Sequence, residues 1–109
     1  MKNKNIIKKN IEFQSIIDKK RYQKNVSFIV YYEKNLQNYL RFGISVGKKI
    51  GNAVLRNKLK RQVRNMIYEL INDIYDKSIN IICIVRKQFQ NQTYKENKSL
   101  LLKTLLKIN

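Results

Sequence analysis

The feature that most constrains the fold is a short apolar run near the end of the chain. Residues Ile79–Val85 are apolar at every position except Asn80. The run is too short to cross a membrane, which takes about 20 apolar residues. It is also too continuous for a surface helix, in which apolar residues recur every three or four positions. It therefore predicts a β-strand that is covered on both faces.

Two further segments carry strand patterns. Val26–Tyr32 is rich in β-branched and aromatic residues, and Leu40–Val46 alternates between apolar and other side chains. The first composition favours a strand, and the second pattern is typical of a half-buried one. We expect these two strands to pair as an antiparallel hairpin.

Helices are predicted by apolar residues that recur three and four positions apart. A short helix begins at Asn10 as a candidate N-cap, and a long one follows Asn52. Thr93 and Glu96 form a capping box for the last helix. The expected core face of the long helix is Leu59, Val63, Met66, Leu70 and Ile74, and that of the last helix is Leu101, Leu105 and Ile108.

The predicted order is helix, strand, strand, helix, strand, helix. This order gives an α+β fold: a small two-layer sandwich with helices on a mixed sheet of about four strands, and a possible extra short strand. A chain of 109 residues fits one domain. We therefore expect a single domain over residues 1–109, with a flexible basic arm over residues 1–9.

The net charge points to a polyanionic partner. Lys and Arg number 24 against 7 Asp and Glu, which gives +17 and a sequence pI near 10.2. Such a balance is typical of nucleic-acid-binding domains. A codon bias could raise the number of lysines. It would not explain the scarcity of acids, or why three of the six arginines lie within nine residues of one another.

The basic residues are concentrated at the beginning of the long predicted helix. Residues Ile50–Arg64 hold five cations and no carboxylate, and the first acids to follow are Glu69, Asp73 and Asp76. This order opposes the helix dipole, which favours anions at the N-terminus. Like charges four residues apart also destabilise a helix. A solvated basic face is the simpler interpretation, but the pattern favours an external polyanion.

Helical spacing arranges these cations. Arg56, Lys60 and Arg64 align on one stripe beside the core face, with Asn57 and Arg61 next to them. We expect the stripe to form the wall of a groove beside the sheet. Lys48 and Lys49, in a glycine-flanked loop just before the helix, could hold a phosphate.

Aromatic residues could supply the other side of such a groove. Phe13 and Tyr31 occur on elements that could face the basic stripe. Unpaired bases stack on aromatic rings, whereas the bases of a duplex are closed to them. Both rings could equally be ordinary core residues, and the sequence leaves that choice open.

Several classes of protein are excluded or disfavoured. The chain has no His and one cysteine, Cys83, so a Ser-His or Cys-His nucleophile is impossible. The basic segment has no carboxylate cluster for metal-assisted hydrolysis. We expect a buried thiol in a reducing cytoplasm, no membrane association, no small-molecule substrate, and no catalytic or metal-binding residues in this chain.

The residues also resemble a known family. Ile44–Arg64 is similar to the signature of the bacterial ribonuclease P protein component. The similarity continues in Lys8–Gln14, in Phe28–Tyr31 and in Ile81–Lys87. It therefore covers nearly the whole chain.

The resemblance implies a function and a set of site residues. Family members partner a catalytic RNA that removes the 5′ leader from precursor tRNA with magnesium ions, and the protein itself holds no cofactor. Phe13, Ile17 and Tyr31 would line the cleft for the single-stranded leader. The implied RNA-binding residues are Lys48, Lys49, Arg56, Asn57, Lys58, Lys60, Arg61 and Arg64.

Two positions depart from the family pattern, because Ile17 stands where a second Phe is common and Lys58 where Arg is frequent.

Two alternative functions are a structural, ribosomal-type RNA-binding protein with no associated reaction, and a protein that binds membrane surfaces through a basic helix. The second is disfavoured because the core needs the apolar face of that helix.

Overall fold

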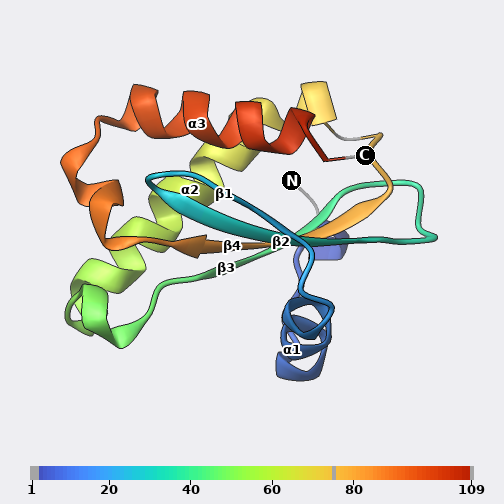
Figure 1. The fold of residues 1–109 in the computed structure, drawn as a ribbon, viewed down its shortest axis with the longest axis horizontal. Helices are drawn as coiled ribbons and strands as arrows, with labels where there is room; N and C mark the ends of the chain where they lie inside the picture. Colours follow the sequence, from blue (N-terminus) through green and yellow to red (C-terminus); the bar gives the residue numbers. More distant parts are fainter. Residues whose placement is uncertain (1–2, 75, 109) are drawn as a thin grey trace.

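Four strands form one mixed sheet in the order β1-β2-β4-β3 (Figure 1). The computed structural model describes residues 3–74 and 76–108. The strands are β1 (Tyr22–Lys24), β2 (Phe28–Lys34), β3 (Arg41–Ser45) and β4 (Ile79–Val85). β4 is antiparallel to β2 and parallel to β3. The predicted mixed sheet is confirmed, and β1 is the extra short strand.

The predicted hairpin is wrong, because β4 lies between β2 and β3. β4 is the apolar run, and every residue in it except Ile84 is buried. A strand with this composition needs neighbours on both edges and cover on both faces. β3 has only two buried residues, Phe42 and Gly43, and its other three residues are half-buried, so it suits an edge position.

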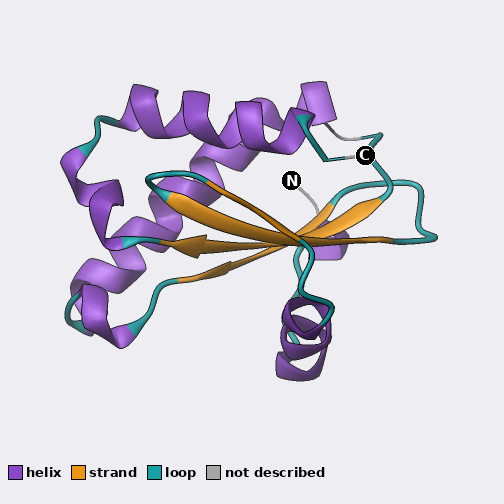
Figure 2. Cartoon of the chain, in the orientation of Figure 1, coloured by secondary structure: helices purple, strands orange, loops and turns teal. Residues whose placement is uncertain are grey.

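Helices lie on both faces of the sheet (Figure 2). α2 (Ala53–Ile74) and α3 (Tyr94–Leu106) cover one face, and the short α1 (Asn10–Asp18) lies on the other. Short 3-10 helices are η1 (Asn3–Asn5), η2 (Lys48–Ile50) and η3 (Lys87–Asn91). The predicted order of helices and strands is therefore confirmed.

The main core lies between the sheet and the pair formed by α2 and α3. All five residues predicted for the core face of α2 are buried, and Ile67 joins them. The three apolar residues predicted for the last helix are also buried. Phe28 and Phe89 pack edge to face within this core.

Side-chain caps fix where two helices begin. The Asn52 side-chain oxygen accepts a hydrogen bond from the Leu55 amide at 2.9 Å. Thr93 and Glu96 exchange the two bonds of a capping box. Both predictions are confirmed. The cap predicted at Asn10 is wrong: Lys9 precedes the first helical residue, and no side chain caps α1.

The segment before α1 packs along β3. The Asn5 side-chain amide donates to the Leu40 carbonyl at 2.6 Å, and the Ile7 amide donates to the Phe42 carbonyl at 2.7 Å. Ile7 is only 2% exposed. The expected flexible arm is thus wrong for residues 3–7, because the apolar pair Ile6 and Ile7 lies along the edge strand β3. Met1 and Lys2 lie outside the described residues.

Cys83 lies within the core strand β4 and is fully buried. Burial raises the pKa of its thiol to about 12, so the sulfur stays protonated and unreactive at neutral pH.

Across residues 3–74 and 76–108, no helix is both long and apolar enough to span a membrane.

Candidate nucleic-acid interface

The face of the sheet that carries α1 is built from two rows of side chains. Residues opposite one another in register project from the same face of a sheet. The first row crosses all four strands through Gly43, Ile82, Tyr31 and Tyr22. The second row lies two residues away along each strand and consists of Ser45, Ile84, Ile29 and Lys24.

α1 packs on the first row through Phe13. A Cβ atom on Gly43 would lie 2.4 Å from Phe13 Cζ, so only glycine lets the ring approach the strand this closely. Around Ile82, a small buried cluster is bordered by the half-buried Phe13, Ile17 and Tyr31. The three predicted cleft residues therefore come together. Their half-buried state leaves part of each side chain accessible, as stacking on a base would require.

Polar contacts hold α1 against the sheet. Arg41 donates to the carboxylate of Glu12 at 2.9 Å, and Lys19 pairs with Glu33. The hydrogen bond from Arg41 lowers the pKa of Glu12. Burial alone would raise the pKa of Glu33, but hydrogen bonds from Lys19 and Asn80 outweigh it and lower that pKa. Glu12 and Glu33 are thus both engaged.

The second row is a partly open apolar strip. Ser45, Ile84 and Ile29 are half-buried, and the exposed Lys24 ends the row at β1. Such a surface offers apolar contact along its length and a cation at its edge. We refer to the two rows, with Phe13 and Ile17, as the cleft.

The basic stripe of α2 reaches this cleft. A pocket of about 160 Å³ lies between α1, β3 and α2, and Phe13, Gly43, Lys60 and Arg64 are among its lining residues. Two of the three stripe residues, Lys60 and Arg64, thus line a pocket beside the sheet, whereas Arg56 does not. Whether RNA occupies it stays a prediction.

The other predicted RNA-binding residues surround the beginning of α2. Lys48 and Lys49 are exposed on η2, and Asn57 and Arg61 are exposed on the outer side of α2. Arg56 is half-buried, and its Nε atom is enclosed without a hydrogen-bond partner among the described residues. A buried donor left in this state costs about 1–3 kcal/mol.

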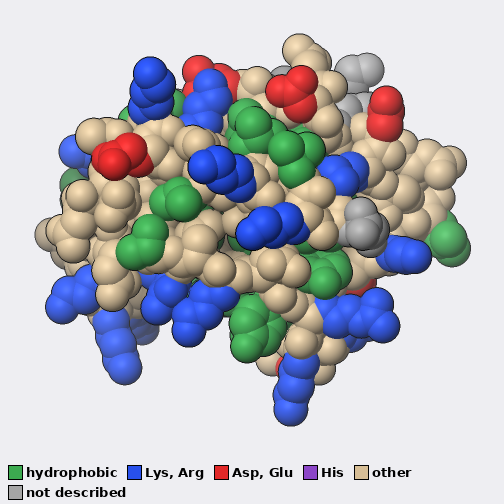
Figure 3. Space-filling model, turned by 45° about the horizontal axis from the view of Figure 1, so that its top comes forward, with side chains coloured by type: hydrophobic (Ala, Val, Ile, Leu, Met, Phe, Trp, Pro, Cys, Tyr) green, Lys and Arg blue, Asp and Glu red, His purple; other side chains and the backbone are tan. Residues whose placement is uncertain are grey.

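These cations have no carboxylate partners within residues 3–74 and 76–108. The ion pairs found there involve Lys19, Arg41 and Lys98. Figure 3 shows Lys and Arg side chains across the visible face and along its lower edge, whereas most Asp and Glu side chains lie in its upper part. The chain therefore does not neutralise the positive charge at the beginning of α2.

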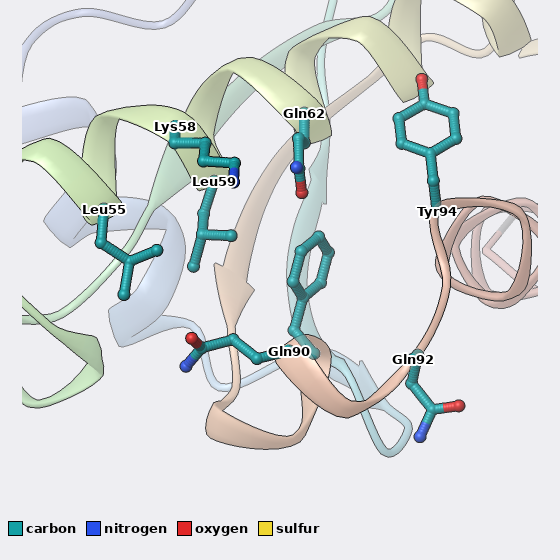
Figure 4. Close-up of a pocket in the computed structure, with 8 residues that line it drawn as sticks. Leu55, Lys58, Leu59, Gln62, Gln90, Gln92 and Tyr94 are labelled. Carbon is teal, nitrogen blue, oxygen red and sulfur yellow. The ribbon is translucent and has the colours of Figure 1, made fainter.

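Lys58 lies apart from the other predicted residues. It lines a pocket of about 260 Å³ on the opposite flank of α2, with Leu55, Gln62, Gln90 and Tyr94 (Figure 4). At about 100° per residue, Lys58 and Lys60 project from roughly opposite sides of the helix. Helical spacing could have separated them, but the family signature groups them together.

Sequence reasoning missed most residues of the cleft, among them Ile29, Ile84 and Tyr22. The alternation within β2 places Ile29 on the same face as Tyr31, and this signal was present in the sequence. Ile84 belongs to a run with no alternation. Tyr22 comes from a strand of three residues, which is too short to show a period.

The cleft does not offer ligands for a metal ion. Magnesium prefers carboxylate and carbonyl oxygens and water, whereas the two carboxylates near the cleft are bound to Arg41 and Lys19. Within the described part of the chain, no three His, Cys, Asp or Glu residues cluster in a way that could hold a metal.

Comparisons with known proteins agree on one family. The family model described as Ribonuclease P matches residues 1–109. The ribonuclease P protein component of Mycoplasma mycoides is 51% identical over 108 residues, which are 99% of each chain. That of Mesoplasma florum is 48% identical over 107 residues, 98% of this chain and 97% of the relative.

Solved structures show the same fold. The ribonuclease P protein of Staphylococcus aureus superposes with a TM-score of 0.80 at 38% identity, covering 94% of this chain and 93% of that one. The protein from Thermotoga maritima gives a TM-score of 0.82 at 33% identity, with 90% and 92% covered. The α+β fold described above is thus shared with these proteins.

Gly43→Ala should destabilise the protein by about 1–3 kcal/mol, because the new methyl group must displace the ring of Phe13. The measurement is urea unfolding followed by circular dichroism. Gly47→Ala is the matched control, because no atom lies within 4 Å of its added Cβ. Equal unfolding midpoints for the two variants would show that Phe13 does not pack on Gly43.

Glu12→Gln should remove a pH-dependent part of the stability. Because the folded pKa of Glu12 lies below 4.5, its contribution is full above the unfolded pKa and is lost as pH falls through the folded pKa. The wild type should therefore be slightly more stable than the variant at neutral pH, and this advantage should vanish in acid. Urea midpoints measured against pH test this, with the exposed Asp73→Asn as control. A constant difference down to acid pH contradicts the Arg41 contact.

Proposed function

The chain belongs to the ribonuclease P protein family, and on that premise we propose that it is the protein subunit of a ribonucleoprotein endonuclease that removes the 5′ leader from precursor tRNA. The observation that carries this proposal is the pocket in which Phe13 meets Lys60 and Arg64. It brings a stacking ring and two phosphate-binding cations together on the cleft.

The cleft suits a single-stranded leader. Bases stack on Phe13 and Tyr31, with Ile17 and the half-buried apolar strip as further contact surface. Arg64 binds a phosphate in a bidentate manner and Lys60 acts as a point charge. A duplex would not fit this mode, because its bases are closed to the rings.

The other predicted RNA-binding residues bind the catalytic RNA. Arg56, Asn57 and Arg61, together with Lys48 and Lys49 on η2, lie around the beginning of α2. Lys58 lies on the far flank. We therefore assign it to the catalytic RNA and not to the leader.

The protein contributes binding and orientation, and the RNA carries out the cleavage. The chain lacks histidine, and its cleft carboxylates are held by cations, so it offers no general base that is free to act. The magnesium ions that support the reaction are then held by the RNA partner and the substrate. Because precursor tRNA is made in the bacterial cytoplasm, we place the protein there.

The first test separates the roles of protein and RNA. The purified protein is mixed with precursor tRNA and magnesium, with and without the cognate catalytic RNA. Cleavage at the mature 5′ end should require the RNA, and the protein should lower the concentration of substrate needed. Cleavage by the protein alone would overturn the division of roles. A protein that binds RNA but leaves the RNA's cleavage unchanged would instead indicate a structural RNA-binding protein.

The second test counts phosphate contacts in the cleft. If roughly four to six cations contact phosphates, affinity for precursor tRNA should fall with a log–log salt slope of about −3 to −5. Lys60→Ala should make that slope shallower by about 1. Lys103→Ala removes the same charge from α3, on the other face of the sheet, and should leave the slope unchanged. Equal effects of the two variants would refute a specific contact at Lys60.

A further inference from the structure

The first row of the cleft continues past Tyr31 to the edge of the sheet. Tyr22 on β1 is the register partner of Tyr31, and the two ring centroids lie 5.4 Å apart with planes tilted by 48°. Phe13 lies over Gly43 at the other end of the same row. Three aromatic rings thus follow one another across the four strands.

Tyr22 is an accessible ring with a fixed neighbour. Its side chain is 49% exposed, and neither buried cluster includes it. The contact with Tyr31 is of the kind that orients aromatic pairs. Within the described residues the Tyr22 hydroxyl has no hydrogen-bond partner. The recorded contact that orients the ring is therefore the one with the Tyr31 ring.

The edge of the sheet around Tyr22 is cationic. Arg21 precedes it and Lys24 lies on the same face, and both are exposed without a carboxylate partner in the described ranges. The acid nearest in the register, Glu33, is bound to Lys19 and Asn80. A phosphate next to Tyr22 would therefore meet positive charge and no free carboxylate.

The spacing of the rings favours an extended strand. Stacked nucleotides in a helix rise about 3.4 Å per step, which is less than the 5.4 Å between Tyr22 and Tyr31. Bases that stack on both rings would be tilted by the 48° between the ring planes, so they would not stack on each other as in a helix, and an unpaired leader suits this arrangement. Aromatic side chains that bind successive bases are a common feature of single-strand binding.

We propose that Tyr22 is a third stacking platform of the cleft, and that it binds the leader base next to the one on Tyr31. This inference rests on the proposed function. The competing explanation is that the pair of tyrosines only stabilises the edge strand, as cross-strand aromatic pairs do. The experiment must therefore detect coupling to one particular base.

The test is a double-mutant cycle on the holoenzyme. Tyr22→Ala, Tyr22→Leu and Tyr22→Phe are each assembled with the catalytic RNA. Their affinity for precursor tRNA is then measured with single abasic nucleotides placed in turn along the leader. Tyr22→Ala and Tyr22→Leu should weaken binding about 5-fold or more, whereas Tyr22→Phe should stay near wild type. Tyr22→Leu keeps apolar cover for Tyr31, so its effect does not depend on disturbed packing.

The position of the coupling decides the outcome. One abasic position should abolish the difference between wild type and Tyr22→Leu, and it should adjoin the position that couples to Tyr31→Ala. Tyr94→Ala removes a ring of similar exposure, 39%, outside the cleft, and its effect should be the same at every position. Additive effects at all positions overturn the role of Tyr22. If no abasic position weakens binding even in the wild type, the leader cleft itself is wrong.

Discussion

The structure depends on the need to cover β4 on both faces. Its buried apolar residues point to both sides of the sheet, so a helical layer on one side alone would leave half of them in water. α2 and α3 cover one side over most of its length. The other side receives only α1, a helix of nine residues, which protects Ile82 and leaves Ile84 half exposed. The cleft is therefore the part of the sheet that the shorter layer does not reach.

α2 combines two tasks that oppose each other energetically. Its first half holds like charges in consecutive turns at the positive end of the helix dipole, which is unfavourable. Six buried residues on one face anchor the helix regardless, at about 1.5–3 kcal/mol for each fully buried large side chain. The helix can thus keep its cations without internal partners, and those cations stay available to an RNA phosphate.

Patterns that are local in sequence predicted the elements well, and pairing between distant segments escaped them. The limits of β4, the Asn52 cap and the capping box at Thr93 follow from neighbouring residues, and all were predicted. The prediction of a hairpin failed because strand order depends on which strand is buried most deeply. That order can be found only by comparing the burial of strands that are far apart in the sequence. The packing of residues 3–7 against β3 is likewise non-local. Lys58 was grouped with the other RNA-binding residues of α2 because the family signature is linear, whereas a helix distributes its residues around an axis.

The few acids of the chain are placed so that they do not compete for the cations at the beginning of α2. Glu69, in the second half of α2, accepts from the Tyr94 hydroxyl and pairs with Lys98 at 3.7 Å, which ties α2 to the beginning of α3. Glu12 and Glu33 tie α1 to the sheet. Each of these carboxylates thus stabilises a junction between elements, while the first half of α2 keeps an unbalanced field. Under the proposed function, that field would attract a polyanion from a distance, and the cleft rings would then select a strand with unpaired bases.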